Sequence, residues 1–311
     1  FLEKPFEPED LSQLIKLATQ KRRLTLESRE LRQELSDGSK IIKKLAGSSK
    51  IMLKLKEDIL DYSQSDAFVL IEGETGSGKT LVAHALHAVS QNMARALITV
   101  HCSAYDEDTL SRRLFGPIQE SDQFLPAFEE AKGGTLILED IETLTKELQG
   151  KLLDKLVELE HSLETRLITI SNHSSPTFAK KILRDDLYFR LSSLKILVPA
   201  LRKRGNDITD LFSQYARSFS EEYGCSPPLL TSEQSIQLMQ APWQGNVRQL
   251  INIAEQIVIQ SRRGELNLSS LLMISEEPMD NTITSDGKPL KVYVEAFEKS
   301  LIENSMRKHK G

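Results

Sequence analysis

The segment Gly73–Thr80, with the sequence GETGSGKT, is the feature that most constrains the fold of this chain. It matches the pattern G-x-x-x-x-G-K-[ST], with an apolar strand-type run before it and a helical pattern after it. Glycines at this spacing let backbone N–H groups wrap phosphates at a helix N-terminus. The sequence therefore predicts a P-loop, in which Lys79 reaches the outer phosphates and the Thr80 hydroxyl binds Mg²⁺. The predicted phosphate-binding residues are Gly73, Glu74, Thr75, Gly76, Ser77, Gly78, Lys79 and Thr80.

Strand-type apolar runs alternate with helical patterns between about residues 45 and 200. This alternation predicts an α/β fold with a parallel sheet flanked by helices. After Pro199 three helical patterns follow one another and predict a small all-helical domain, whose second helix begins with a capping box of Thr231 and Gln234. The strand-type runs are 67–73, 97–102, 135–140, 166–171 and 194–199; helical stretches include 79–91 and 146–159, and the later helices are 206–223, 231–241 and 245–262.

The two ends of the chain have a different pattern. Leucines at heptad spacing in residues 9–35 favour a short coiled coil and dimerisation, although a single helix lying on a domain fits the same pattern. Residues 264–288 are polar and irregular, as in a linker, and the final stretch is one amphipathic helical pattern. The predicted divisions of the chain are 1–38, 39–200, 201–264, 265–288 and 289–311.

Composition excludes several classes of protein. The 311 residues carry a formal net charge of −5, which gives no electrostatic reason for the chain as a whole to bind nucleic acid. There is no apolar run of membrane-spanning length and no signal-peptide pattern, so we expect a cytoplasmic protein without a membrane partner. Cys102 and Cys225 lack metal-binding spacing and are interpreted as packing residues in a reducing compartment.

An acidic pair follows the third strand-type run, TLILED, as Glu139 and Asp140. P-loop enzymes need one carboxylate for Mg²⁺ and a second group to orient the attacking water. We therefore predict that Glu139, with Thr80, holds Mg²⁺ and that Asp140 orients the water. Two acids at a solvated strand end would be the alternative interpretation if the P-loop were absent.

Longer segments add a resemblance to a family. AKGGTLILEDIETL, LRDDLYFRL and APWQGNVRQL, in that order, resemble the AAA+ domain of bacterial enhancer-binding proteins, especially the C4-dicarboxylate-transport response regulators. These are hexameric ATPases that remodel RNA polymerase holding sigma-54. The resemblance covers about residues 40–264 and implies an AAA+ P-loop NTPase fold with a helical lid, ATP and Mg²⁺ as ligands, and assembly into a ring.

The resemblance also assigns roles to single residues. It places Asn172 at sensor I near the γ-phosphate and Arg248 at sensor II in the lid. Arg184 and Arg190 occupy the positions of arginine fingers, which reach the nucleotide of a neighbouring subunit. Guanidinium groups suit phosphate charge, and supplying them from another subunit makes hydrolysis depend on assembly.

The chain ends resemble parts of two further domains of this family. FLEKPFEPEDL resembles the close of a receiver domain, and the final helical pattern resembles the first helix of a Fis-type helix-turn-helix domain. The resemblance implies a sensor kinase as partner of the receiver and DNA as partner of the C-terminal domain, most of which would lie outside this sequence.

Three departures from the family affect the expected activity. The acidic pair reads Glu139-Asp140, whereas the family has Asp-Glu, so the water-orienting acid is one methylene shorter and fast hydrolysis is in question. His101 stands where the family has an Asn facing the catalytic acid; it either bonds that carboxylate, with a charge that would vary with pH, or has a plain packing role. Residues 117–127, PIQESDQFLPA, replace the Gly-Ala-Phe-Thr-Gly-Ala loop that contacts sigma-54, and their one aromatic residue, Phe124, is interpreted as packed.

Three hypotheses follow from these departures. The first is an ATP-binding response-regulator-type transcription factor that does not use the usual sigma-54 loop. The second is a sigma-54-dependent activator whose divergent loop contacts the factor differently. The third is a non-hydrolysing scaffold, in which nucleotide assembles the oligomer and DNA binding is the output.

Overall fold

The computed structural model describes residues 45–91, 93–116, 125–162, 165–172, 182–262 and 268–274. The predictions for the N-terminal coiled coil, the receiver end, Phe124 and the final helix lie outside these residues. The chain divides into two compact units, residues 1–268 and 269–311, and each is described by itself. Within the described residues no helix is long and apolar enough to cross a membrane.

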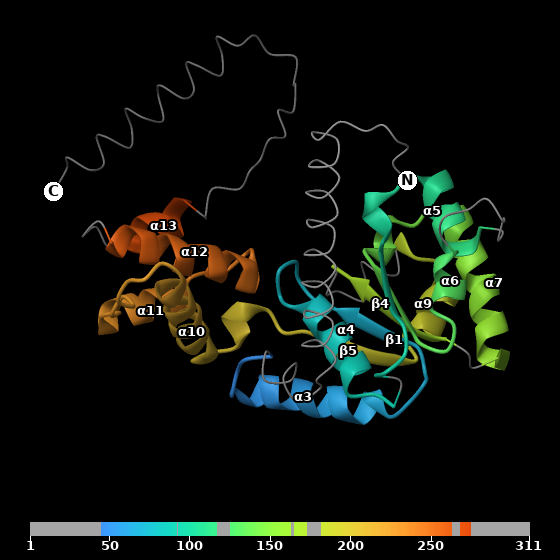
Figure 1. Cartoon of the computed structure of the whole chain (residues 1–311), viewed down its shortest axis with the longest axis horizontal. Helices are drawn as coiled ribbons and strands as arrows, with labels where there is room; N and C mark the ends of the chain where they lie inside the picture. The colour runs from blue at the N-terminus through green and yellow to red at the C-terminus, as the bar shows by residue number, and fades with distance from the viewer. Residues whose placement is uncertain are drawn as a thin grey trace, which may run out of the picture. The chain divides into compact units, whose positions relative to one another are not determined.

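The five predicted strands are confirmed and form one sheet in the order β2-β3-β4-β1-β5 (Figure 1). Every pair of neighbouring strands is parallel. The central strands β3, β4 and β1 are buried along their whole length, in keeping with their largely apolar sequences. The strands are β1 (Val69–Glu72), β2 (Leu97–His101), β3 (Thr135–Glu139), β4 (Arg166–Ser171) and β5 (Leu194–Leu197).

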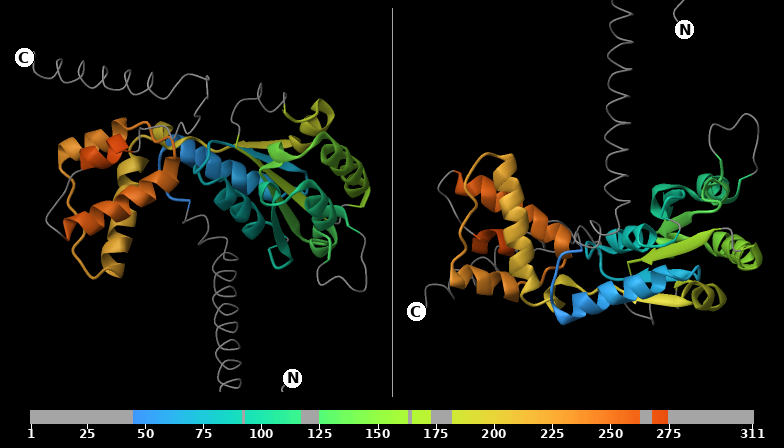
Figure 2. Two further views of the ribbon diagram at one scale, coloured as in Figure 1. Left: turned by 90° about the horizontal axis from the view of Figure 1, so that it is seen from above. Right: turned by 60° about the horizontal axis from the view of Figure 1, so that its bottom comes forward.

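Helices cover both faces of this sheet, as Figures 1 and 2 show. One face packs against α3 (Lys50–Ser63) and α4 (Lys79–Ala88) through alternate strand residues such as Val69 and Ile71. The intervening residue Leu70 belongs to the core on the other face. That second face is covered by α5 (Glu107–Phe115), α6 (Ala127–Glu130), α7 (Lys146–Ser162) and α9 (Asp185–Leu191).

Short 3-10 turns follow three of the strands and carry residues of the site. These turns are η1 (Cys102–Ala104) after β2, η2 (Ile141–Thr143) after β3 and η3 (Leu201–Lys203) after β5. Because the carboxyl ends of parallel strands meet at one edge of a sheet, ligands of such folds bind there. The P-loop follows β1 at this same edge.

The all-helical domain predicted after Pro199 is confirmed. Trp243 and Phe212 are almost fully buried in it, at 0% and 1% exposure. Its second helix begins with the expected capping box, in which the Gln234 N–H donates to Thr231 Oγ1 at 3.2 Å and the Thr231 N–H donates to Gln234 Oε1 at 2.9 Å. The helices are α10 (Asp207–Glu222), α11 (Ser232–Gln240) and α12 (Asn246–Ser261).

One prediction about the region after α12 is wrong. Residues 264–288 were expected to be irregular, but Leu268–Ile274 forms the helix α13. Its sequence, LSSLLMI, ends in four adjacent apolar residues, and Leu268 is 2% exposed. Burial of this leucine, rather than composition of the surrounding polar stretch, accounts for the helix.

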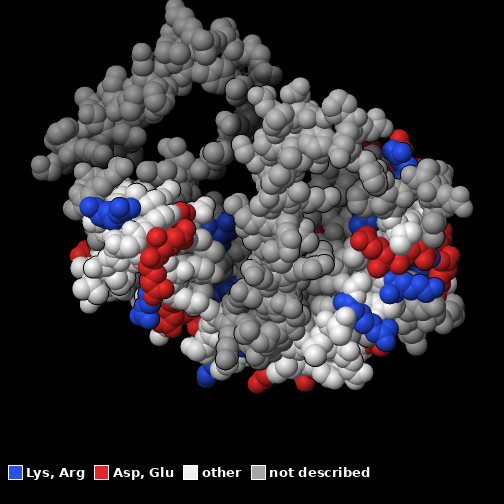
Figure 3. All heavy atoms as spheres, in the orientation of Figure 1, with Lys and Arg blue, Asp and Glu red and all other residues white. Residues whose placement is uncertain are grey.

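The charged side chains are mixed on the described surface that Figure 3 displays. Lys and Arg lie beside Asp and Glu over both the sheet domain and the helical domain. The described part of this face carries no broad patch of positive charge, in keeping with the net charge of −5.

Candidate nucleotide-binding site

The P-loop conformation depends on glycines with left-handed backbone angles. Gly76 and Gly78 have φ values of 75° and 102°, which residues with a side chain rarely adopt. Gly78 is the N-cap of α4, so the helix begins at Lys79. The Lys79 side chain is 7% exposed and folds back to donate from Nζ to the Glu74 carbonyl oxygen at 3.0 Å.

Thr80 and Glu139 lie together at the start of α4 and the end of β3. Thr80 Oγ1 donates to Glu139 Oε2 at 3.1 Å. Glu139 is 9% exposed, and its second oxygen, Oε1, is buried without a hydrogen-bond partner. A hydroxyl beside a partly unpaired buried carboxylate is an oxygen donor set that suits Mg²⁺, which takes few protein ligands together with phosphate and water. These residues therefore fit the predicted metal.

Asp140 is held by two hydrogen bonds from other parts of the chain. Ser103 Oγ in η1 donates to Asp140 Oδ2 at 2.5 Å, and Asn172 Nδ2 donates to Oδ1 at 2.6 Å. Asp140 has a φ of 58°, a conformation that a short polar residue tolerates better than most. Both carboxylate oxygens thus have a fixed donor, which sets the direction of the side chain.

Asn172 connects this acid to the P-loop. Besides its bond to Asp140, its Oδ1 accepts from Thr75 Oγ1 at a long 3.4 Å. Its backbone N–H donates to Glu142 Oε1 at 3.0 Å. The residue predicted as sensor I therefore touches both the phosphate-binding loop and the predicted water-orienting acid.

Glu142 is a third carboxylate at this edge of the sheet, and the sequence reasoning missed it. Its Oε2 atom is buried without a hydrogen-bond partner. Burial lowers the pKa of the Lys79 ammonium below its ordinary value. The Glu142 carboxylate opposes that pKa shift more than Asp140 or Glu139 does. The position of Glu142, two residues after Asp140 in the turn that follows a buried strand, is the signal that could have identified it.

His101 does not face Asp140 as the family resemblance implied. Its Nδ1 lies 3.6 Å from Glu139 Oε2, and its side chain is 58% exposed. His101 and Glu139 are paired in register on the neighbouring strands β2 and β3, which places them side by side. Ser103, two residues further along, bonds Asp140 instead, and the sequence reasoning did not identify it.

The helical domain reaches the P-loop through the first turn of α12. The Val247 N–H donates to the Gly76 carbonyl oxygen at 3.0 Å. Arg248 follows on the same turn, and a Cβ atom placed on Gly76 would lie 3.2 Å from its Cβ atom. Its charge is a minor cause of the lowered pKa of Lys79, whose main cause is burial. The structure thus brings the predicted sensor II residue to the P-loop.

A cavity of about 470 Å³ opens beside these groups. It lies between the P-loop, the end of β4 and the segment that precedes α12, and its volume is in the range of ligand pockets. Its lining residues are Glu74, Thr75, Asn172, Arg202, Pro242 and Gln244.

Arg184 and Arg190 lie at the two ends of α9. Arg184 is exposed and makes a bidentate pair with Asp186, with N–O distances of 3.1 and 2.7 Å. This hydrogen bonding raises the pKa of Arg184. Arg184 therefore binds an acid of its own segment, and the role of both arginines in a neighbouring subunit stays a prediction.

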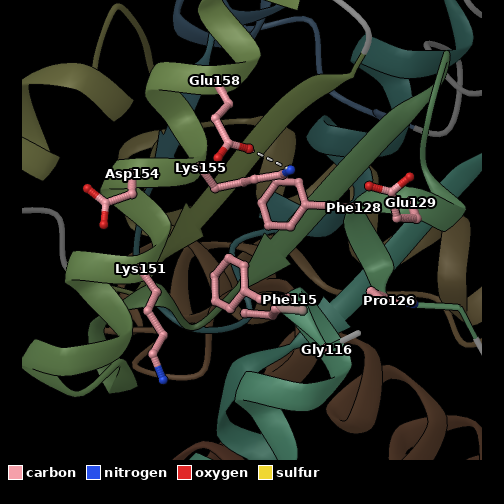
Figure 4. A pocket seen from close by; sticks show the side chains of 10 residues that line it. Phe115, Gly116, Pro126, Phe128, Glu129, Lys151, Asp154, Lys155 and Glu158 are labelled. Carbon is pink, nitrogen blue, oxygen red and sulfur yellow. Dashed lines mark hydrogen bonds and ion pairs between the residues drawn. The ribbon is translucent and has the colours of Figure 1, made fainter. Parts of the chain in front are cut away.

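A second pocket, of about 320 Å³, lies at the two ends of the segment that we predict to replace the sigma-54 loop (Figure 4). We call it the loop-base pocket. The rings of Phe115 and Phe128 stack with centroids 5.6 Å apart. Arg113 holds the two ends together, donating to the Leu125 carbonyl oxygen and to Glu130, both at 2.8 Å. The pocket is lined by Leu114, Phe115, Gly116, Pro126, Phe128, Glu129, Lys151, Asp154, Lys155 and Glu158.

Comparison with known proteins identifies two families along the chain. Residues 45–197 match the Sigma-54 interaction domain, and residues 202–284 match an AAA+ ATPase lid domain. The second match extends through residues that were predicted to be a linker.

Individual relatives agree with these families. The chain is 35% identical to the C4-dicarboxylate transport transcriptional regulatory protein DctD of Pseudomonas aeruginosa, covering 97% of this chain and 66% of that protein. It is 30% identical to DctD of Rhizobium meliloti, covering 100% of this chain and 68% of that protein. The chain thus spans about two thirds of the length of these relatives.

A solved structure of a related protein is similar over the whole chain. NtrX from Brucella abortus in complex with ADP has a TM-score of 0.71 and 28% identity, covering 100% of this chain and 72% of that chain. Its complex with ATP has a TM-score of 0.69 and 29% identity, with the same coverage. The AAA+ P-loop NTPase fold predicted from the sequence is therefore confirmed.

Proposed function

Because this chain belongs to the family of sigma-54-dependent transcriptional regulators with an AAA+ P-loop NTPase domain, we propose that it binds Mg·ATP and hydrolyses it within an oligomer to control transcription. The observation that carries the proposal is that Thr80, Glu139 and Lys79 lie together at one edge of the sheet. Thr80 bonds Glu139 there, and the buried Oε1 atom of Glu139 has no hydrogen-bond partner. NtrX of Brucella abortus, one of the structural relatives, has been solved in complexes with ATP and with ADP, which supports the choice of nucleotide.

The chain's own groups divide the work of binding. Lys79 and Arg248 bring positive charge to the outer phosphates, and the N-terminus of α4 adds backbone N–H groups. Thr80 and Glu139 would hold Mg²⁺, which neutralises phosphate charge when bound. The pairing of Thr80 with Glu139 in the structure keeps these two oxygen ligands at one place.

Asp140 and Asn172 would act on the attacking water. Asp140 is the carboxylate that follows Glu139 directly and can accept a proton from this water, and Ser103 and Asn172 fix its direction. Asn172 also touches Thr75 in the P-loop, so the position of the acid is linked to the phosphate-binding loop. This arrangement would offset the shorter side chain of Asp140, because the rate depends on orientation as well as on reach.

Assembly would complete the site. Arg184 pairs with Asp186 in its own chain and is exposed at the start of α9. In a ring Arg184 and Arg190 would approach the nucleotide of the next subunit, where a guanidinium stabilises charge in the transition state. Hydrolysis would then depend on protein concentration.

The second part of the proposal concerns which partners the assembled protein contacts to control transcription. The usual sigma-54 signature is absent from residues 117–127, so we propose a regulator of response-regulator type that does not use this loop. Its remaining expected partners are DNA, RNA polymerase and a sensor kinase. A sigma-54 activator with a divergent loop and a non-hydrolysing scaffold are the alternatives.

ATP turnover of the assembled chain tests the enzymatic part. Lys79→Ala should lower turnover at least about 100-fold, because a buried cation that faces transferred phosphate is lost. Lys54→Ala, an exposed lysine of α3, is the matched control and should leave turnover unchanged. ATP binding without turnover would support the scaffold, and equal turnover in wild type and Lys79→Ala would reject this site.

Sigma-54 capture tests the output. We expect no retention of sigma-54 by the chain in the presence of Mg·ADP and aluminium fluoride, which mimics the transition state. Specific retention that requires the analogue would instead establish a divergent contact loop.

A further inference from the structure

Three consecutive carbonyl groups of the P-loop are bound by donors from the helical domain or from the turn that precedes it. Asn246 Nδ2 donates to the Thr75 carbonyl oxygen at 3.0 Å. The Val247 N–H donates to the Gly76 carbonyl oxygen at 3.0 Å, and Arg204 Nη2 donates to the Ser77 carbonyl oxygen at 2.6 Å. Three consecutive peptide groups are therefore fixed from one side.

Fixing a carbonyl also fixes the N–H of the same peptide group. In a planar trans peptide the C=O and the following N–H point in opposite directions. The bond from Asn246 to Thr75 therefore turns the Gly76 N–H away from the helical domain, and the bond from Arg204 to Ser77 does the same for the Gly78 N–H. These are backbone donors of the kind that a P-loop offers to phosphate.

Both polar side-chain atoms of Asn246, Oδ1 and Nδ2, make hydrogen bonds in this contact. It is 0% exposed and has a φ of 51°, which asparagine tolerates better than most residues. Its Oδ1 accepts from the Leu201 N–H at 2.8 Å, while Nδ2 also lies 3.2 Å from Glu74 Oε2. The single side chain joins η3, the P-loop and the start of α12.

The neighbouring contacts leave little freedom at this joint. A Cβ atom placed on Gly76 would lie 2.3 Å from the Gly245 carbonyl oxygen, so the loop and the start of α12 are in direct contact. Glu74 is held by Arg202 through two short contacts, one of them 2.6 Å from Nη1 to Oε2. The hydrogen bond from Asn246 thus acts on a loop that is already anchored at Glu74.

We propose that Asn246 is a positioning residue for phosphate binding: it orients the Thr75–Gly76 peptide so that the Gly76 N–H faces the nucleotide. This inference rests on the proposed binding of ATP at the P-loop. It adds a role for the helical domain that is separate from the charge of Arg248, because the effect passes through the loop backbone.

The test is the affinity of the full chain for Mg·ATPγS, measured by isothermal titration calorimetry. Asn246→Asp keeps the size of the side chain but replaces the NH₂ donor with an oxygen that faces the Thr75 carbonyl and Glu74. It should weaken binding at least tenfold. Asn206→Asp makes the same chemical change at an exposed residue next to α10 and should bind within twofold of wild type.

Two further variants separate positioning from loss of folding. Asn246→Gly tolerates the positive φ but lacks the donor, and it should weaken binding at least threefold with an unchanged circular dichroism spectrum. Glu74→Gln removes the negative charge that the carboxylate introduced by Asn246→Asp would face. The double variant should therefore recover at least threefold of the affinity lost in Asn246→Asp. A variant that is simply misfolded would not be rescued by this second change.

The outcomes distinguish this inference from the proposed function. Wild type that binds, together with Asn246→Asp and Asn246→Gly that bind within twofold of it, would overturn the inference and leave the proposed function intact. Wild type that fails to bind Mg·ATPγS would overturn both. Weakened binding with rescue by Glu74→Gln is the expected result.

Discussion

The P-loop and the loop-base pocket lie on the same α/β domain but differ in what holds them in place. The P-loop carbonyls are bound by donors from distant segments, and its lysine is buried. The loop-base pocket is instead stabilised by apolar stacking of Phe115 on Phe128 and by Arg113, with exposed charged residues of α7 along its side. Hydrogen bonds fix the direction of the groups that they join, whereas apolar contacts are non-directional and only keep side chains close together. A phosphate-binding site needs hydrogen bonds, because its backbone N–H groups must point at the phosphate.

The sequence predicts that the two regions follow the family pattern to different extents. A changed residue in the P-loop would break a directed contact, and the sequence there matches the motif throughout. The segment between Gly116 and Leu125 joins two ends that Arg113 already holds together. The following variants test whether the two regions are independent.

The largest expected effect is on the stability of the loop-base pocket. Phe128→Ala should lower the free energy of unfolding by about 3 kcal/mol, because Phe128 is 4% exposed and its removal leaves a cavity. The affinity for Mg·ATPγS should stay within twofold of wild type below the unfolding transition. Urea denaturation and calorimetry measure the two quantities.

Phe189→Ala is the matched control for that variant, since Phe189 is 62% exposed on α9. It should change stability by less than about 1 kcal/mol. Loss of nucleotide affinity in Phe128→Ala while the protein is folded would show that the two regions are coupled.

The second-largest expected effect is on ATP turnover and follows from changing Asp140 in the nucleotide site. Asp140→Asn should lower ATP turnover about 100-fold, equivalent to about 2.7 kcal/mol, because an amide cannot take a proton from water. Affinity for Mg·ATPγS should remain within about threefold, since Asp140 is not among the predicted phosphate ligands. Steady-state turnover and calorimetry provide the measurements.

Asp154→Asn makes the same change on the exposed surface of α7 and should leave turnover unaltered. Equal turnover in wild type and Asp140→Asn would remove Asp140 from the mechanism. Glu142, whose charge acts most strongly on Lys79, would then be the acid to test next.

The smallest effect concerns Ser103. Ser103→Ala removes one of the two donors on Asp140, and turnover should fall about fivefold, or about 1 kcal/mol, with ATP affinity unchanged. Ser103→Thr keeps the hydroxyl and should restore most of the rate. If the threonine variant were as slow as the alanine variant, the hydrogen bond would not be the cause.

The local patterns were sufficient to predict the parts of the site that are contiguous in sequence. A P-loop uses its own backbone, so GETGSGKT contains nearly all the groups that the motif requires. The strand β4 was predicted with its observed bounds because its leucine, isoleucines and threonine form one strand-type run. The helix α13 was missed because its leucines stand within a polar stretch and only burial stabilises a helix that short.

The contacts between segments could not be predicted in the same way. The family resemblance implied that His101 faces Asp140, but the strand register pairs His101 with Glu139 and leaves Ser103 to bond Asp140. A hydrogen bond depends on differences of less than an ångström, and register and turn geometry decide these only after the sheet is assembled.

What the sequence by itself determined is the P-loop, the alternation that makes a parallel sheet, and the acidic pair at its edge. What only the tertiary structure decided is how that pair is oriented and how the helical domain meets the loop. Asn246 shows the reason. Its four neighbours come from segments up to 172 residues away, and a side chain acquires such partners only when the chain has folded around it.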